Sequence, residues 1–105
     1  MAVSNKPWSS FSESDYTPEQ FCRAALIDLN PSGSPKVKAL CKLPVREPSG
    51  TLNRNGVHAA AAVLAGARGG VSAPAAAKRA AARRLRSAYA EMDEQPPESL
   101  TRLSG

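Results

Sequence analysis

The chain has 105 residues, enough for one small domain with a modest hydrophobic core. Of these residues 42% are hydrophobic, but much of that share is alanine and only five residues are Phe, Trp or Tyr. The net charge of +5 and the isoelectric point of about 9.7 favour an acidic partner: nucleic acid, an anionic membrane or an acidic protein surface.

Several classes of protein are excluded by the same composition. Two cysteines are too few for a disulfide framework or a zinc site. The first residues, MAVSNKPW, lack the apolar segment of a signal peptide, and no apolar run approaches the roughly 20 residues of a transmembrane helix. We therefore expect a soluble product of a reducing compartment that does not bind membranes.

The first 15 residues are predicted to form an extended N-terminal arm, because they are rich in Ser and show neither helical nor strand periodicity. Trp8 and Phe11 in this arm are either plugs that tie it to the domain or anchors that become ordered on a partner. Tyr16, which follows the arm directly, is the third aromatic residue that we assign to partner binding.

Residues 16–95 are predicted to form a single α+β domain. The run from Thr17 to Gln20 has the order of a capping box and predicts that a helical turn begins there. The following FCRAALIDL is compatible with a helix, but the turn after it favours a strand. That turn, NPSG at 30–33, fits a type I turn with a glycine bulge, and alternating apolar residues follow it. We therefore predict a β-hairpin of residues 21–29 with 36–45.

The register of this hairpin decides whether the two cysteines can bond. With the bulge, Ile27 lies opposite Val37 and the apolar residues share one face, so Cys22 and Cys41 point to opposite faces. A two-residue loop would instead place Cys22 opposite Cys41, close enough for a disulfide. We favour the bulged register because it collects the apolar side chains, although it leaves Arg23 on the same face. Both cysteines are then expected to be small buried hydrophobes.

Two helices are predicted to pack on the hairpin as a two-helix hairpin. Asn53 or Asn55 caps the first, which runs to about residue 68 and stops at Gly69-Gly70. Ser72 caps the second, which runs from about residue 73 to 92. Their apolar stripes comprise Val57, Ala60, Ala61, Leu64 and Ala67 in the first helix, and Ala81, Leu85, Ala88 and Met92 with Tyr89 in the second. Residues 96–105 are predicted to be a polar C-terminal tail.

No group of residues predicts catalysis, so we expect a protein that is not an enzyme, with no catalytic residues, cofactor or metal. His58 is the only histidine and lies in the first turn of a predicted helix, where a solvent-facing or capping role is expected. Neither Cys22 nor Cys41 has a recognisable base to activate it. The pair Gly69-Gly70 is not followed by the lysine and hydroxyl residue of a phosphate loop.

A basic stripe of Arg79, Arg83 and Arg86 lies on the second predicted helix. Two short helices joined by a glycine turn resemble a helix-turn-helix, and this stripe could meet phosphates. The helix offers no Asn or Gln to read base edges, so it supports only binding to the nucleic-acid backbone. The simpler interpretation is a solvated arginine face that nearby carboxylates partly balance.

Several runs of the sequence resemble a small module of tailed-phage and prophage structural proteins. They are CRAALIDLNPSG, KVKALCKLPVREPSGTLNRNGVHAAAAVLAGARGGV, AAKRAAARRL and EQPPESL. This module occurs alone or attached to larger head-maturation and XkdF-like proteins, and the likeness spans about residues 15–100. Its most specific part is LPVREP with NRNGVHAAAAVLAGARGG.

The resemblance implies a virion protein made in the bacterial cytoplasm: a decoration or cement protein of the capsid, or an assembly factor. Its partners would be the major capsid protein and neighbouring copies of itself, with Trp8 and Phe11 bridging subunits by many weak contacts. The resemblance implies no catalytic residues. The alternative function is a basic nucleic-acid-binding or DNA-packaging factor that uses the arginine stripe.

Overall fold

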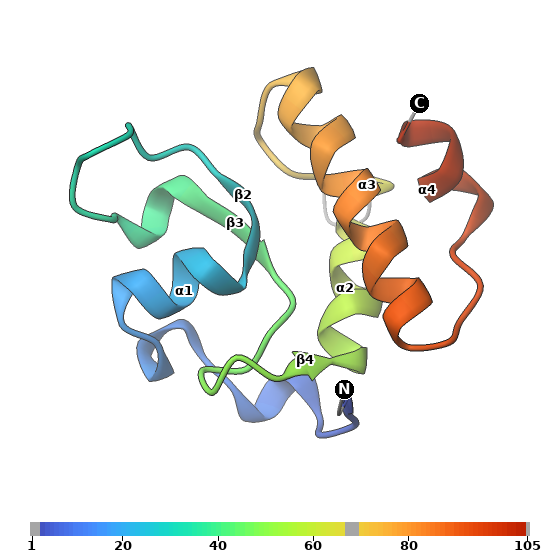
Figure 1. Ribbon diagram of the computed structural model, residues 1–105, viewed down its shortest axis with the longest axis horizontal. Helices are drawn as coiled ribbons and strands as arrows, with labels where there is room; N and C mark the ends of the chain where they lie inside the picture. The colour runs from blue at the N-terminus through green and yellow to red at the C-terminus, as the bar shows by residue number, and fades with distance from the viewer. Residues whose placement is uncertain (1–2, 67–69, 105) are drawn as a thin grey trace.

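The computed structural model describes residues 3–66 and 70–104. This part of the chain contains four α-helices and two small β-sheets (Figure 1). The α-helices are α1 (Pro18–Ala24), α2 (Arg54–Leu64), α3 (Ala75–Glu91) and α4 (Glu98–Leu103). The strands are β1 (Val3–Ser4), β2 (Ala25–Asp28), β3 (Cys41–Pro44) and β4 (Leu52–Asn53), and the 3-10 helices are η1 (Trp8–Ser10), η2 (Glu13–Asp15) and η3 (Lys38–Leu40). The predicted α+β class is confirmed.

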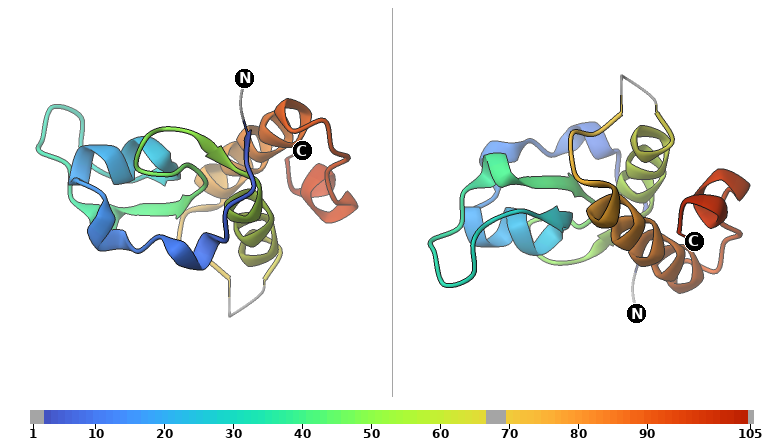
Figure 2. Two further views of the ribbon diagram at one scale, coloured as in Figure 1. Left: turned by 90° about the horizontal axis from the view of Figure 1, so that it is seen from below. Right: turned by 90° about the horizontal axis from the view of Figure 1, so that it is seen from above.

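The helix α1 and the antiparallel pair of β2 and β3 form one end of the molecule, and α2, α3 and α4 form the other (Figure 2). The predicted capping box at the start of α1 is present. The Thr17 hydroxyl accepts a hydrogen bond from the Gln20 amide at 3.1 Å, and the Gln20 side chain accepts one from the Thr17 amide at 2.8 Å. This cap makes residues 18–24 helical, so the chain enters the sheet only at Ala25.

The register predicted for the hairpin is wrong. Ile27 lies opposite Lys42 and Asp28 opposite Cys41, whereas the bulged turn would have placed Ile27 opposite Val37. The tight turn begins at Pro31 rather than Asn30, with its amide-to-carbonyl bond from Ser34 to Pro31 at 3.3 Å. Asn30 is not the first residue of this turn. Its side chain accepts a hydrogen bond from the Val37 amide at 2.9 Å, and this contact supports a longer loop.

Cys22 and Cys41 form a disulfide, which corrects the prediction that they point to opposite faces as separate hydrophobes. The prediction failed because it placed Cys22 on a strand, where side chains alternate between faces. Cys22 instead lies on α1, whose inner face packs against β3, and its Cα is 5.3 Å from that of Cys41. Around this bond is a small buried cluster of Tyr16, Phe21, Cys22, Ala24 and Cys41.

The larger core lies between α2, α3 and the sheet residues, and it contains the predicted apolar stripes of both helices within the described residues. Asn53, one of the two candidate caps, accepts a hydrogen bond from the Gly56 amide at 2.8 Å and starts α2. This helix ends at Leu64 and Gly66 follows with φ +116°, so the chain leaves the helix earlier than predicted. Ala67, Arg68 and Gly69, part of the predicted helix end, lie outside the described residues. The N-cap of α3 is Pro74, not Ser72.

Both ends of the described chain pack on the domain. Strand β1 pairs in parallel with β4, where Val3 lies opposite Leu52. The predicted polar tail is wrong, because residues 98–103 form α4, which packs against α3 through the buried Leu100. No helix of residues 3–66 and 70–104 is long and apolar enough to cross a membrane.

Removing the disulfide should lower the stability of the domain. The bond joins residues that are 19 apart in sequence. Closing a loop of that size lowers the conformational entropy of the unfolded chain, which stabilises the folded state by about 3 kcal/mol. We expect Cys22→Ala/Cys41→Ala to lower the free energy of unfolding by roughly that amount in urea titrations. Adding a reductant should lower the free energy of unfolding of the natural chain by the same amount, and it should leave that of the double variant unchanged. A natural chain that is insensitive to reductant would contradict the bond.

The two candidate caps of α2 should differ strongly when each is replaced by alanine. Asn53 is fully buried and also donates to Glu47, so Asn53→Ala should cost about 2–4 kcal/mol of unfolding free energy. Asn55 is exposed and donates only to backbone carbonyls of the N-terminal segment, so Asn55→Ala should cost no more than about 1 kcal/mol. Equal losses in thermal or urea unfolding would show that Asn53 is not the principal cap.

Candidate functional site

The aromatic residues assigned to partner binding lie on the domain itself. Trp8 is half-buried against Gly56, where an added Cβ would come within 3.0 Å of the indole ring. Phe11 is also half-buried, and its ring centre is 5.9 Å from that of Trp8. The structure therefore uses Trp8 as a plug that holds the N-terminal segment on α2.

Tyr16 is not available to a partner, which corrects its assignment to partner binding. Only 5% of the residue is exposed, and its ring packs edge-on against Phe21 with centres 5.4 Å apart. Its hydroxyl donates a hydrogen bond of 2.6 Å to the backbone carbonyl of Arg46. Burial, together with the negative charges of Glu47 and Asp15, raises the pKa of Tyr16, so its hydroxyl remains a donor.

The three arginines of the basic stripe on α3 differ in their contacts. Arg83 donates to the Ser104 carbonyl at 3.2 Å and Arg86 donates to the Ser104 hydroxyl at 3.1 Å, so both hold α4 on α3. Arg79 lies one turn away and is exposed. A shallow hollow of about 590 Å³ beside Arg83 and Arg86 is also lined by Glu94, whose carboxylate pairs with Arg54.

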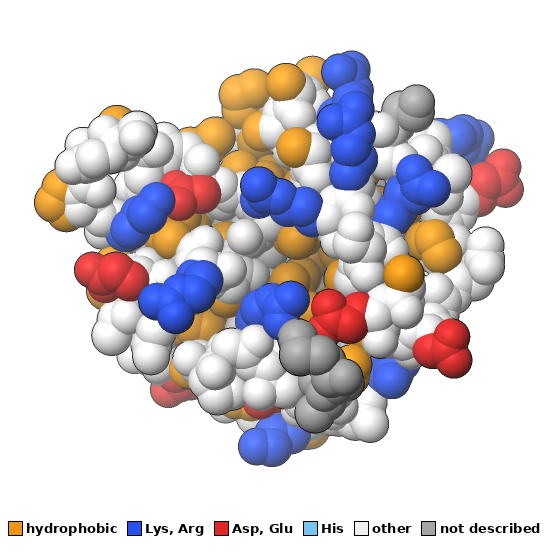
Figure 3. All heavy atoms as spheres, in the orientation of Figure 1, with side chains coloured by type: hydrophobic (Ala, Val, Ile, Leu, Met, Phe, Trp, Pro, Cys, Tyr) orange, Lys and Arg blue, Asp and Glu red, His pale blue; other side chains and the backbone are white. Residues whose placement is uncertain are grey.

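A different set of arginines surrounds a groove between α1, the 47–50 turn and α3. Two adjoining hollows of about 490 and 290 Å³ form it, and they share Arg23, Ala24 and Arg46. Arg84 joins from α3. We call this feature the arginine groove and define it by its two linings, residues 20, 23–26, 45–50, 52, 84, 87, 88 and 91. Figure 3 shows a central area with a hydrophobic floor that is bordered by Lys and Arg side chains and by an acidic side chain.

The three guanidinium groups of the groove are held to different degrees. Arg84 donates to the Leu26 carbonyl at 2.9 Å across the groove. Arg46 donates to the Gly50 carbonyl at 3.1 Å and lies 3.9 Å from a carboxylate oxygen of Glu91. Arg23 is exposed and makes no hydrogen bond or ion pair with another described residue. The groove thus combines three cations with one carboxylate at its rim.

Glu47 also lines the groove, but its carboxylate is directed into the protein. It is 6% exposed and accepts a hydrogen bond of 2.9 Å from the Asn53 amide. Burial alone would raise the pKa of Glu47, but hydrogen bonds from Ser4 and Asn53 and the charge of Lys6 outweigh it, so the pKa is lowered. The carboxylate is therefore held ionised and turned toward Asn53, so its negative charge still counts against the arginines of the lining.

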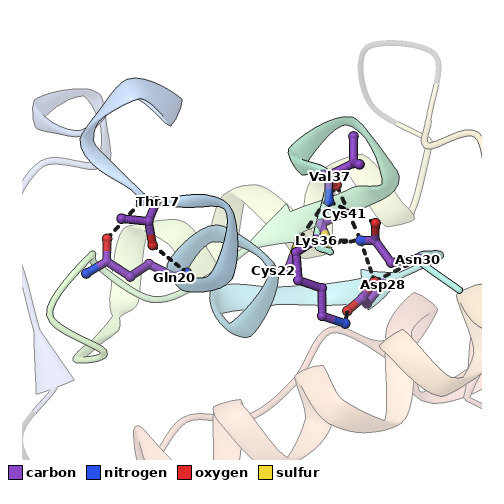
Figure 4. Close-up of a disulfide and its surroundings, with 8 residues drawn as sticks. All are labelled: Thr17, Gln20, Cys22, Asp28, Asn30, Lys36, Val37 and Cys41. Carbon is purple, nitrogen blue, oxygen red and sulfur yellow. Dashed lines mark hydrogen bonds and ion pairs between the residues drawn. A yellow bond between two sulfur atoms is a disulfide. The ribbon is translucent and has the colours of Figure 1, made fainter. Parts of the chain in front are cut away.

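The surroundings of the disulfide form a second polar cluster (Figure 4). The Sγ atoms of Cys22 and Cys41 and a carboxylate oxygen of Asp28 lie within 4.8 Å of one another, as metal ligands would. The sulfurs are bonded to each other, however, and Lys36 pairs with Asp28 at 2.5 Å. The Asn30 amide donates to Asp28 at 2.8 Å and also approaches Cys41 Sγ at 3.2 Å. The arrangement therefore serves as a cross-link that fixes the 29–40 loop.

His58 lies in the first turns of α2 and is exposed, as predicted. Its Nε2 is 2.8 Å from Glu94, and its ring stacks on Tyr89 with centres 5.9 Å apart. Arg54 pairs with the same carboxylate. These contacts attach the end of α3 to the start of α2, which is a structural role.

The arginine groove could not be found by local sequence patterns. Arg23, Arg46 and Arg84 lie on three separate elements, and only folding brings them to one hollow. Arg23 was the single misfit of the predicted hairpin, a charged residue on an apolar face, and this was the one available signal. No family model, curated protein or solved structure matches this chain.

The pair of Asp28 and Lys36 should make the stability of the fold depend on pH in acid. The hydrogen bonds from Lys36 and Asn30 lower the pKa of Asp28 from 3.8 to about 2. A carboxyl group whose pKa is lower in the folded state stabilises fully above the unfolded value and loses this contribution as the pH falls toward the folded value. The stabilisation should therefore disappear between about pH 4 and pH 2.

Urea unfolding of the natural chain and of Asp28→Asn over this range measures the effect. We expect the natural chain to be more stable above about pH 4, and the difference to shrink steadily below it. Stability curves that stay parallel down to about pH 2 would show that the ion pair contributes nothing.

Proposed function

We propose that the protein is a phage virion structural protein, a capsid auxiliary of the decoration or cement type that binds and stabilises the capsid shell. The proposal rests on one observation, which is where in the fold the sequence that resembles phage structural modules lies. The run from Leu43 to Gly56 supplies β4, the cap of α2, and the turn that forms one wall of the arginine groove. This part of the likeness therefore covers elements of the framework and one wall of the arginine groove.

The structure changes the way in which such a protein would bind. We expected the N-terminal arm to bridge neighbouring subunits, but Trp8 packs on Gly56 and β1 pairs with β4. Binding by a preformed surface of the folded domain is the simpler mechanism, because it requires no segment to detach. Many copies on a symmetric shell would then bind firmly through contacts that are individually weak.

Binding to nucleic acid is the second candidate function. The net charge of +5 favours it, as it favours any acidic partner. The predicted contact stripe supports it less, because Arg83 and Arg86 are engaged by Ser104. A backbone-binding protein would also lose affinity steeply with salt, which a gel-shift series measures directly.

The proposal predicts that purified particles of the phage or induced prophage that encodes this chain contain the protein. Mass spectrometry should find it at a copy number comparable to that of the major capsid protein, or at a fixed fraction of it. Particles that lack the protein should bind the purified chain again and should then resist a higher temperature before they open. These gains are expected because each bound copy stabilises the shell by mass action.

A truncated chain without residues 1–12 provides the control for the mechanism. Its folded state must first be confirmed by thermal unfolding, because β1 pairs with the domain. If this variant folds and binds shells normally, the domain surface is sufficient. Absence of the protein from purified particles, together with failure to bind shells, would reject the proposed function.

A further inference from the structure

We propose that the arginine groove binds an acidic segment of a partner protein, with its carboxylates on Arg23, Arg46 and Arg84 and its apolar side chains on the groove floor. This inference deepens the proposed function and rests on it for the identity of the partner as a capsid protein.

The charge of the groove selects an anionic partner. Arg23 comes from α1, Arg46 precedes the 47–50 turn and Arg84 comes from α3, so three cations face one hollow. Glu91 is the one carboxylate of the lining that is not buried, and it lies 3.9 Å from Arg46. The carboxylate of Glu47 is buried and turned toward Asn53, away from the hollow. The lining therefore carries three arginines against two carboxylates, an excess of one positive charge.

Because the cations are guanidinium groups, the anionic groups that fit the groove best are carboxylates and phosphates. A guanidinium group presents several N–H donors in a planar fork that matches either anion. Arg84 and Arg46 each use one terminal nitrogen on a backbone carbonyl, which fixes the direction of the group and leaves other donors for a ligand. Arg23, which has no partner among the described residues, is fully available.

The floor of the groove favours an acidic protein over a nucleic-acid backbone. The apolar residues that line the hollow expose only 1–7% of their surface each, so the floor is a small apolar area; they are Ala24, Leu26, Val45, Leu52 and Ala88. A segment that alternates carboxylates with apolar side chains would cover this floor and pair with the rim at the same time. A phosphate backbone could satisfy the rim only.

The direct test uses a short peptide of alternating Glu and Leu, added to the full chain and followed by amide NMR spectra. We expect shift changes concentrated in residues 23–26, 46–50 and 84–91, and an affinity that falls as salt is added. The same peptide with Gln in place of Glu should bind at least about tenfold more weakly, since it loses the charge-assisted hydrogen bonds.

Two charge reversals form a matched pair for this test. Arg23→Glu should lower the affinity for the peptide by at least about tenfold. It should not unfold the chain, because Arg23 makes no hydrogen bond or ion pair with a described residue. Arg79→Glu changes the net charge equally but lies outside the groove lining, so it should leave the affinity within about twofold. Thermal unfolding of both variants verifies that they are folded.

Several results would overturn the inference. They are the absence of peptide binding at millimolar concentration, shift changes that fall elsewhere, and equal effects of the two reversals. Self-association that Arg23→Glu abolishes would assign the groove to a second copy of this chain. If an oligonucleotide bound more tightly than the peptide, and if Arg23→Glu abolished that binding, the groove would be assigned to nucleic acid.

The inference and the proposed function can fail separately. If the protein is present in particles but the peptide does not bind, the virion role stands and the acidic occupant is rejected. If the peptide binds as expected but the protein is absent from particles, the groove chemistry stands and the partner is not a capsid protein.

Discussion

One buried side chain, the amide of Asn53, joins the start of α2 to the 47–50 turn and to the N-terminal segment, where its partner Lys6 lies 47 residues away in sequence. Its Oδ1 accepts from the Gly56 amide at 2.8 Å, while its Nδ2 donates to Glu47 at 2.9 Å and to the Lys6 carbonyl at 3.1 Å. The residue has no exposed surface, so any partner removed would leave a buried polar group without a hydrogen bond. The start of α2, the 47–50 turn and the N-terminal segment are therefore held together by this one residue.

Local chemistry predicted the elements whose determinants lie within a few residues. The capping box at Thr17, the cap at Asn53 and the apolar stripe of α3 are of this kind, and all three are present. The stripe was readable because α3 is long enough to repeat its pattern over several turns. The six-residue α4 is too short for a pattern, and it is held by the buried Leu100 and by the bonds of Arg83 and Arg86 to Ser104.

What could not be predicted depends on contacts within loops and between separate elements. The hairpin register depends on Asn30, whose side chain binds Asp28 and Val37 and replaces the expected turn. The disulfide depends in turn on where α1 ends, since Cys22 belongs to a helix. The arginine groove has the same origin, because its three cations come from separate elements. Sequence could supply the net positive charge, but only the fold shows where part of it is concentrated.

The groove lies where the disulfide-linked cluster meets the larger core, and its walls are fixed before any partner arrives. Tyr16 holds the Arg46 carbonyl from one cluster, and Arg84 of α3 donates to Leu26 from the other side. The turn between these walls is closed by the Gly50 amide, which donates to the Glu47 carbonyl at 2.8 Å. A rigid site loses little conformational entropy on binding. Its three arginines outnumber its two carboxylates, so an acidic occupant would bring the groove closer to neutrality and would join the two clusters across it.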